Sequence, residues 1–317
     1  MDTKIGITNA EWVLLRVLLN QSPLGSREII AKLPASNQWS TATIKTFLSR
    51  LVAKKVIGYR TVKNAFLYYP LVTEMDYVRK ETKSLFARIY GDTVVHETEH
   101  FQFSGGESHA FIVRLADALE ANYPRITDDL NYRHPQKHMV YVHASFKVMQ
   151  SALGYEDGPG WMTAGWFWEI LHVAPEETFK KSPFEKAILH VFTQLLMHFV
   201  NPYAPFWLIE GMAVYEAQWL DPETIKKAMA IEKDQLDPYS VFRVPTDYQV
   251  FRQQRGYELA ITVIQFIVER YGQEKFQSYL RAPERLRSLF GCSETAFWTS
   301  WLAYVRQTYL NEEETVR

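Results

Sequence analysis

The segment from Phe184 to Glu216 constrains the fold of this chain more than any other. Residues 184–200 contain neither Gly nor Pro, and their apolar residues recur at the spacing of a buried helix. An Asn-Pro turn follows at Asn201 and Pro202, and a second apolar segment begins at about Phe206. We therefore expect two consecutive helices joined by a short turn.

This helix pair resembles the zinc-binding part of the gluzincin metallopeptidases. Zinc peptidases carry H-E-x-x-H on a helix because positions i and i+4 share one face, so two imidazoles can bind one metal while the Glu polarises its water. The corresponding positions, from His190 to Gln194, read H-V-F-T-Q. Downstream, W-L-I-E-G-M-A-V-Y (207–215) resembles the W-x-x-E-G-x-A-x-Y segment whose Glu is the third ligand, here Glu210.

The resemblance implies an active site that has lost its catalytic residues. The first and third ligands are kept, but Val191 replaces the general base and Gln194 replaces the second ligand. General acid/base catalysis of this kind contributes about 10² to 10⁴ in rate, and zinc sites use three or four protein ligands. We expect no catalytic residue, no metal and no cofactor. One alternative stays open, which is zinc bound by His190, His198 and Glu210.

We expect the cleft of this site to persist as a pocket for a small molecule or a peptide. The segment from Trp161 to Ala174 is predicted to form two strands around Gly165, and it is the candidate wall, although packing in the core explains its tryptophans equally well. Tyr257 falls where related peptidases often place a Tyr over the substrate. The expected pocket residues are His190, Val191, Gln194, Glu210, Trp166 and Tyr257.

The N-terminal region has the element order of a winged helix. Three short amphipathic segments, each preceded by a turn or capping residue, are followed by two alternating segments separated by Lys63-Asn64. Thr8 or Asn9 is the expected cap of the first helix and Ser26 that of the second. The predicted helices are 7–19, 27–33 and 40–55, and the predicted strands are 56–62 and 65–71.

The third predicted helix has the composition of a helix that reads the DNA major groove. Hydroxyl residues and a Lys lie near its N-terminal end, apolar residues lie on the other face, and basic residues suited to phosphate follow. Residues 1 to 75 carry a net charge of +6 and the remainder −7, which also favours a polyanionic partner for the N-terminal region. The predicted DNA-binding residues are Ser40, Thr41, Thr43, Lys45, Thr46, Arg50, Lys54 and Lys63.

Residues 5 to about 90 resemble the penicillinase-repressor family of transcription regulators (the BlaI/MecI type). The segments that carry the resemblance are ITNAEWVLLRVLL, SREIIAKL, WSTATIKTFLSRLVAKK and AFLYYPLV. The resemblance implies a homodimer that binds double-stranded operator DNA through the third helix and the wing. A winged helix used only for protein contacts is the alternative.

A literal H-E-x-x-H also occurs, from His96 to His100, in a segment with the alternation of a strand. Side chains four residues apart on one strand share a face but stand roughly 13 Å apart, too far to bind one metal. We therefore do not predict a metal site there.

The whole chain is predicted to be an α+β protein of 317 residues with two domains and a helical connection. A single Cys and the absence of a signal peptide or an apolar stretch of membrane-spanning length predict a cytoplasmic protein without membrane contact. The predicted parts are a winged-helix domain (1–73), a helical linker (74–92) and a degenerate gluzincin-like domain (93–317) with a small sheet and a helical C-terminal lobe.

These observations predict a DNA-binding transcription regulator whose inactive peptidase-like domain binds a ligand, a peptide or a partner and so changes operator binding. The first alternative is an active zinc metallopeptidase with an accessory winged-helix domain. The second is a scaffold protein in which both domains are interaction modules.

Overall fold

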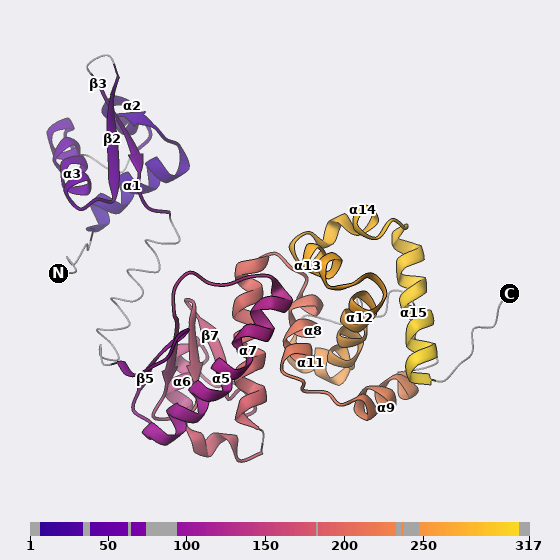
Figure 1. Cartoon of the computed structure of the whole chain (residues 1–317). Coiled ribbons are helices and arrows are strands. Elements are labelled where there is room, and N and C mark those ends of the chain that lie inside the picture. The colour runs from indigo at the N-terminus through magenta and orange to yellow at the C-terminus, as the bar shows by residue number, and fades with distance from the viewer. Residues whose placement is uncertain are drawn as a thin grey trace. The chain divides into compact units, whose positions relative to one another are not determined.

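The computed structural model describes residues 7–33, 39–62, 65–73, 94–181, 183–232, 236–237 and 247–310. The chain divides into two compact units, Met1–Asp92 and Thr93–Arg317, called unit 1 and unit 2 below (Figure 1). Lys63 and the predicted linker 74–92 lie outside the described residues.

Unit 1 is a winged helix built on three helices and a small antiparallel sheet. Buried Leu, Ile and Val side chains from all three helices and the start of β2 form its core. The sheet has the strand order β1-β3-β2, with β2 and β3 forming the wing. The elements are α1 (Asn9–Asn20), β1 (Leu24–Gly25), α2 (Ser26–Ala31), α3 (Thr41–Ala53), β2 (Ile57–Val62) and β3 (Ala65–Pro70).

Two local features of unit 1 differ from, or refine, the sequence prediction. Thr8 is the cap of α1, because its side chain accepts the Glu11 N–H while the Glu11 carboxylate accepts the Thr8 N–H. The prediction that Ser26 caps α2 is wrong. The cap residue is Gly25, whose N–H donates to the Glu28 carboxylate at 2.6 Å, and Ser26 is the first helical residue.

Unit 2 begins with a five-stranded mixed sheet of order β4-β5-β6-β8-β7. The central strands β5, β6 and β8 are parallel, and the edge strands β4 and β7 are antiparallel to their neighbours. Helix α5 (His109–Leu130) makes the crossover from β5 to β6. The strands are β4 (Val94–Glu97), β5 (Phe101–Gly105), β6 (His138–Val142), β7 (Ala164–Phe167) and β8 (Ile170–Val173).

The hairpin formed by β7 and β8 turns at Trp168 and Glu169, not around Gly165 as predicted. Both turn residues have positive φ, 52° and 61°, the conformation of the two-residue turns that match the twist of antiparallel strands. Gly165 lies within β7, where a Cβ atom would come within 2.5 Å of Leu153. The glycine therefore serves close packing against α6 (Phe146–Ala152) and the residue that ends it, Leu153.

The predicted helix pair is present as α7 (Phe184–Val200) and α8 (Phe206–Glu216). Helix α8 lies between α7 and α12 (Gly256–Tyr271) (Figure 1). The contact between α8 and α12 is close, because a Cβ on Gly211 would come within 2.9 Å of the Ala260 Cβ. All three helices belong to the large hydrophobic core of unit 2.

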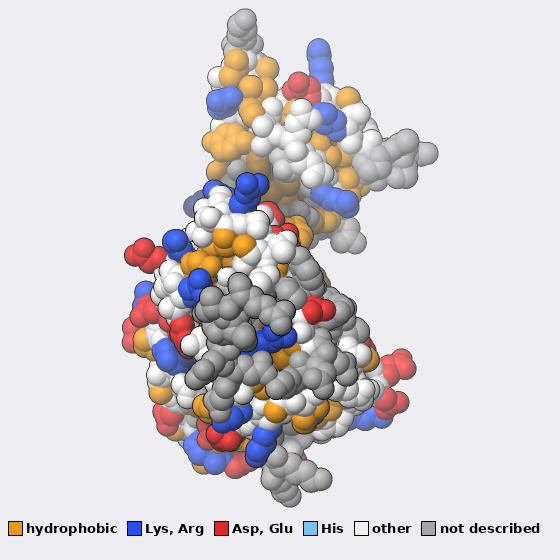
Figure 2. All heavy atoms as spheres, turned by 90° about the vertical axis from the view of Figure 1, so that its right-hand side faces the viewer, with side chains coloured by type: hydrophobic (Ala, Val, Ile, Leu, Met, Phe, Trp, Pro, Cys, Tyr) orange, Lys and Arg blue, Asp and Glu red, His pale blue; other side chains and the backbone are white. Residues whose placement is uncertain are grey.

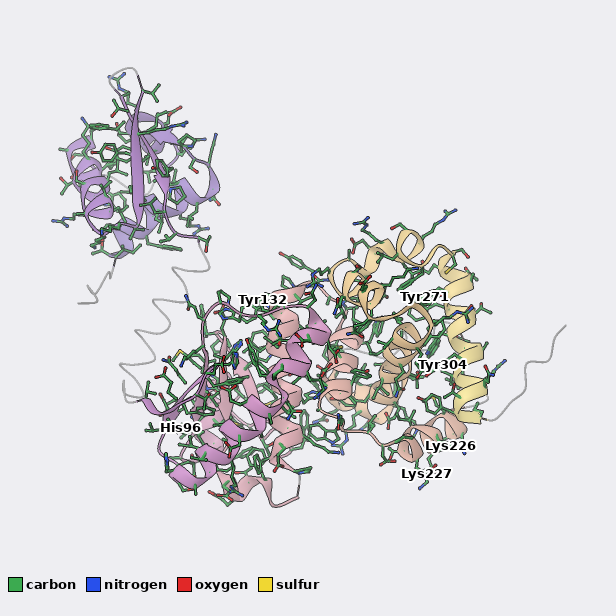
Figure 3. All side chains as sticks on the ribbon, viewed as in Figure 1. His96, Tyr132, Lys226, Lys227, Tyr271 and Tyr304 are labelled. Carbon is green, nitrogen blue, oxygen red and sulfur yellow. The ribbon has the colours of Figure 1, made fainter. Side chains whose placement is uncertain are left out.

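The C-terminal part of unit 2 is helical, as predicted. Tyr271 packs against Phe290 and Phe297, with ring centroids 4.5 Å and 6.0 Å away, and Tyr304 packs against Phe266, so aromatic side chains join α12 to α14 and α15 (Figure 3). The remaining helices are α9 (Pro222–Glu232), α11 (Tyr248–Gln253), α13 (Gln273–Arg281), α14 (Leu286–Phe290) and α15 (Glu294–Leu310), with short 3-10 turns at Glu176–Lys181 and Pro283–Arg285.

The surface of unit 2 carries charges of both signs. Figure 2 shows Lys and Arg side chains interspersed with Asp and Glu on the face that it presents. Within the described part of the chain, no helix combines the length and apolar character needed to cross a bilayer.

Candidate functional site

The exposed face of α3 carries most of the predicted DNA-binding residues. Ile44, Leu48 and Leu51 are buried in the core of unit 1. The opposite face is open to solvent, and it includes Thr41, Lys45, Thr46 and Arg50. A helix with one buried face and one exposed face of hydroxyl and basic side chains has the form required to enter a DNA groove.

Several hydroxyl groups on this helix already have local partners. Ser40 caps α3, accepting the Thr43 N–H at 3.1 Å, and its hydroxyl lies 2.8 Å from the Thr43 hydroxyl. The Thr46 hydroxyl donates to the Ala42 carbonyl at 3.0 Å. These residues therefore order the start of the helix, and each can still offer an oxygen lone pair to an incoming group.

Lys54 differs from the other predicted phosphate contacts because it has a partner inside unit 1. Its ammonium donates to the Glu11 carboxylate at 2.7 Å, and Glu11 is completely buried. Burial alone would raise the pKa of Glu11, but hydrogen bonds from Lys54 and from the Thr8 N–H outweigh it and hold that pKa below its ordinary value. The main role of Lys54 is thus to neutralise a buried carboxylate.

An aromatic cluster on the wing was not predicted. Tyr59 and Phe66 are 48% and 52% exposed, and their ring centroids lie 4.7 Å apart. Tyr68 completes the cluster, 6.2 Å from Tyr59. The two-residue spacing of Phe66 and Tyr68 in β3 could have indicated this shared face, because Tyr59 of β2 pairs directly with Tyr68, and Thr61 with Phe66.

In unit 2, the structure brings together the three positions at which the resemblance expects zinc ligands. His190 and Gln194 lie one turn apart on α7, and Glu210 comes from α8. The Gln194 side-chain amide donates to Glu210 Oε1 at 2.7 Å and lies 3.2 Å from His190 Nε2. Glu210 Oε2 lies 3.3 Å from His190 Nε2. The sequence prediction that these side chains share one site agrees with this geometry.

These side chains do not fit a zinc site. Zinc sites in proteins use three or four thiolate, imidazole or carboxylate ligands, and here the amide nitrogen of Gln194 points at both remaining ligands. Within the described residues, no group of three or more His, Cys, Asp or Glu could hold a metal ion. His198 does not complete the set. It lies eight residues after His190, about 12 Å along the helix, and its ring contacts Trp166.

A pocket lies in front of this polar group. Trp166, His190, Val191, Gln194 and Tyr257 line it, as predicted, while Glu210 is 1% exposed and lies behind His190 and Gln194. The cavity is partly open to solvent and has a volume of about 170 Å³. Of the other lining residues, Trp161, Met162, Ala164 and Gly165 belong to the segment predicted as the candidate wall, whereas Leu153, Tyr155 and Tyr248 were not predicted.

The two tyrosines of the pocket that lie closest to Glu210 are strongly perturbed. Burial raises the pKa of Tyr248 and of Tyr257 well above the ordinary value, and the charge of Glu210 raises both further. Both phenols therefore stay protonated at all physiological pH values and can donate hydrogen bonds.

The literal H-E-x-x-H motif does not lie on one strand, so that prediction is wrong. His96 lies on β4 (Figure 3), the chain turns after Glu97, and His100 immediately precedes β5. The imidazole of His100 is hydrogen-bonded to Glu120 at 2.7 Å and stacks on Tyr123. No metal site forms from these side chains among the described residues.

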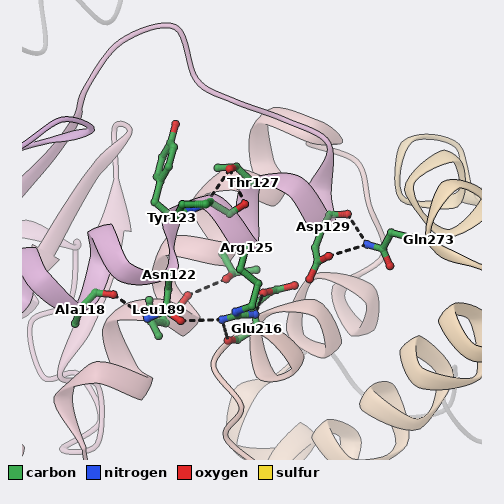
Figure 4. A network of polar contacts seen from close by, with 11 residues as sticks. Ala118, Asn122, Tyr123, Arg125, Thr127, Asp129, Leu189, Glu216 and Gln273 are labelled. Atoms are coloured by element: carbon green, nitrogen blue, oxygen red, sulfur yellow. Dashed lines mark hydrogen bonds and ion pairs between the residues drawn. The ribbon is translucent and has the colours of Figure 1, made fainter.

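Two buried polar groups outside the pocket hold unit 2 together. The rings of His143 and His172 are hydrogen-bonded at 2.9 Å. Burial lowers the pKa of His143 to about 3, with the charge of His172 as a second cause, and burial lowers that of His172 to about 4. Arg125 of α5 binds the completely buried carboxylate of Glu216 at the end of α8 (Figure 4). The histidine pair joins the end of β6 to β8, and the ion pair joins α5 to α8.

Comparison with known proteins identifies the N-terminal region. The family model "Penicillinase repressor" matches residues 7–119. The chain is 31% identical over 105 residues to the penicillinase repressor of Bacillus licheniformis, which covers 32% of this chain and 82% of that protein. It is 31% identical over 91 residues to the methicillin resistance regulatory protein MecI of Staphylococcus aureus (28% and 74%), and 25% identical over 118 residues to the penicillinase repressor of the same species (37% and 94%).

The family match is longer than the resemblance that the sequence motifs indicated. That resemblance was expected to end near residue 90, but the match continues to residue 119, through β4, β5 and the first half of α5. Through this N-terminal region, the chain belongs to the penicillinase-repressor family.

Proposed function

We propose that this protein is a DNA-binding transcription regulator in which unit 1 binds double-stranded operator DNA and unit 2 binds a regulatory ligand. The observation that carries the proposal is the family relationship of residues 7–119 to proteins named as repressors. The exposed face of α3 supports it, because Thr41, Lys45 and Arg50 lie opposite the buried side of that helix.

The two ends of α3 are proposed to contact different parts of the DNA. Thr41 and Lys45 lie in its first turns, the part of a recognition helix that contacts base edges in the major groove. Arg50 lies toward its C-terminal end and suits a phosphate contact, as does exposed Arg60 on the wing. Each phosphate contact releases condensed counterions, so binding should weaken as the salt concentration rises.

Unit 2 is proposed to be a degenerate gluzincin-like domain that does not hydrolyse peptides. The position of the general base is occupied by Val191, a buried apolar side chain. The side-chain amide of Gln194, at the position of the second ligand, donates a hydrogen bond to Glu210. A cavity of about 170 Å³ lined by aromatic rings and a few polar groups is nevertheless present, and it is smaller than the roughly 300–1,000 Å³ of sites for drug-sized ligands, so it suits a small molecule or one end of a peptide. Its proposed ligand is a small molecule or a peptide.

Regulation is proposed to work by population shift. If two arrangements of a homodimer differ in affinity both for the ligand and for the operator, the ligand changes operator affinity by the same factor as the operator changes ligand affinity. The chain needs no catalytic step for this role.

The proposal is tested by selecting duplexes from a random pool with the full chain at about 150 mM salt, an ionic strength at which non-specific contacts are screened. We expect enrichment of one sequence, with two related half-sites if the chain is a homodimer. A pool that stays random after repeated rounds would leave unit 1 as a protein-interaction module.

A second experiment tests the proposal that unit 2 does not hydrolyse peptides. The pure chain is incubated with a mixed peptide library, and the appearance of cleavage products would establish peptidase activity.

A further inference from the structure

The carboxylate of Glu210 is buried without a Lys or Arg partner. Among the described residues, its one ion-pair neighbour is His190, and the side chains that line the pocket in front of it include no Lys or Arg. Glu210 Oε1 accepts from Gln194, and the neutral phenols of Tyr248 and Tyr257 also interact with the carboxylate, whereas no hydrogen bond of normal geometry reaches Glu210 Oε2 among the described residues. A buried anion in this state is costly unless a positive charge compensates it.

The polar atoms beside Glu210 leave an opening for such a charge. His190 Nε2 and Glu210 Oε2 lie 3.3 Å apart, and the donor nearest to both is the single amide group of Gln194. When His190 Nε2 accepts from the Gln194 amide, it presents a lone pair to Glu210 Oε2 at this distance. An incoming N–H donor with a positive charge would relieve that contact at the inner end of the pocket.

The walls of the pocket also favour a cation. Five aromatic residues line it, from three separate parts of unit 2: Tyr155, Trp161, Trp166, Tyr248 and Tyr257. The ring of Trp161 lies 6.1 Å from that of Tyr248, and the rings of Tyr257 and His190 are 6.2 Å apart. The negative faces of aromatic rings attract ammonium groups, more strongly where the site is shielded from water.

We infer that this pocket binds an organic ammonium group, with its charge directed at Glu210 and its apolar substituent against Trp161, Trp166 and Tyr248. This inference rests on the proposed ligand-binding function of unit 2 and specifies the chemical class of the ligand. The ammonium can belong to a small amine or to the N-terminus of a peptide. An anionic ligand is disfavoured, because it would meet the charge of Glu210 in a site without Lys or Arg side chains.

The test is isothermal titration of the full chain with probes of one shape and different charge. 2-Phenylethylammonium is compared with the neutral 2-phenylethanol and the anionic phenylacetate. We expect the ammonium probe to bind at least about tenfold more tightly than the alcohol, which corresponds to about 1.4 kcal/mol, and the anion to bind most weakly. Equal affinity for ammonium and alcohol, or no binding of either, would overturn the inference.

Variants locate the site. Glu210→Gln keeps the shape of the side chain and removes its charge, so the preference for the ammonium probe should disappear. The matched control is Glu216→Gln, which alters another buried Glu of the same helix outside the pocket and should keep the preference. If Glu210→Gln does not fold, the inference is tested by the affinities of the unaltered chain for the ammonium, alcohol and anionic probes. Preference retained in a folded Glu210→Gln variant would contradict the assignment of Glu210.

Two further arms identify the source of the ammonium group and exclude a metal. Alanyl-phenylalanine amide is compared with its N-acetylated form, and tighter binding of the free peptide than of 2-phenylethylammonium would identify a peptide N-terminus as the source. Zinc chloride alone is the competing probe, and stoichiometric zinc that displaces the ammonium probe would overturn the inference.

Duplex binding is measured on the same preparation. Loss of the ammonium preference with intact duplex binding refutes only this inference, whereas loss of duplex binding refutes the proposed regulator.

Discussion

The side-chain amide of Gln194 lies 2.7 Å from Glu210 Oε1, and this buried hydrogen bond joins α7 to α8. Glu210 is 1% exposed and Gln194 is 8% exposed, so the bond is almost completely shielded from water. Hydrogen bonds to charged groups are worth about 1.5–3 kcal/mol in stability. This hydrogen bond therefore helps to hold the two helices together at this point.

This relationship predicts that one substitution creates a metal site. In Gln194→His, the imidazole would stand beside His190 and Glu210, giving the three ligands that open zinc sites use. We expect the variant to bind about one zinc per chain, measured by native mass spectrometry after addition of zinc, and the unaltered chain to bind much less. A variant that folds but binds no more zinc than the unaltered chain would show that the three positions are not arranged as described. Val191→Glu is the matched control, because it adds a carboxylate but leaves two ligands.

The ion pair between Arg125 and Glu216 predicts a difference between two arginine variants. Arg125→Met leaves the fully buried Glu216 without its cation, which is expected to lower the free energy of unfolding by up to about 3–5 kcal/mol. Burial raises the pKa of Glu216 to about 8, so uptake of a proton limits this loss below pH 8. The control Arg114→Met breaks an ion pair with Glu176 that is about half exposed, and should cost under about 1 kcal/mol. Urea unfolding measures both, and equal losses would contradict the prediction.

The buried pair His143 and His172 predicts how the stability of unit 2 depends on pH. Unfolded imidazoles take up protons near pH 6.5, whereas the folded ones do so only near pH 3 and 4. Between these values the unfolded state binds more protons, so the free energy of unfolding should fall as the pH is lowered from 6.5 toward 4, by up to about 1.4 kcal/mol per pH unit for each His. Urea unfolding at several pH values measures this slope. His172→Gln should flatten it, and an unchanged slope in that variant would exclude the pair as its cause.

The two faces of α3 predict which basic residues matter for DNA. Lys45→Ala and Arg50→Ala should each weaken binding to a selected duplex and reduce the slope of log affinity against log salt by about 1 if the residue contacts a phosphate. Lys226→Ala is the control, because this exposed Lys lies on α9 of unit 2 (Figure 3) and should leave binding unchanged. Fluorescence anisotropy at several salt concentrations provides the data. Identical affinities for all three variants and the unaltered chain would remove α3 from the interface.

The parts of the fold predicted well from the sequence are those set by local patterns. The bounds of α7 follow from an uninterrupted apolar period that begins after Pro183 and ends at Asn201 and Pro202. The order of helices and wing in unit 1 follows in the same way from helical and alternating periods. Because His190 and Gln194 are four residues apart on a helix, their shared face was also predictable.

Other features depend on contacts that no local pattern reveals. Trp168 and Glu169 adopt positive φ, which their residue types rarely do, so the position of the β7–β8 turn was missed. The hairpin at His96–His100 was missed because the alternation of residue types continues through the turn, as it would in a single strand. Tyr248 reaches the pocket from α11, more than fifty residues after His190 in the sequence, and only tertiary packing brings the two together. The spacing of apolar residues in α1 likewise did not reveal that Glu11 is buried. This burial determines the role of Lys54.

The central claim is that unit 1 recognises a specific DNA sequence. The most direct measurement is the affinity of the full chain for the duplex selected from the random pool, compared with a duplex of the same composition in scrambled order, at about 150 mM salt. We expect the selected duplex to bind at least about 10³-fold more tightly, which is the lower end of the range for specific DNA-binding proteins. Equal affinities for the two duplexes would contradict it.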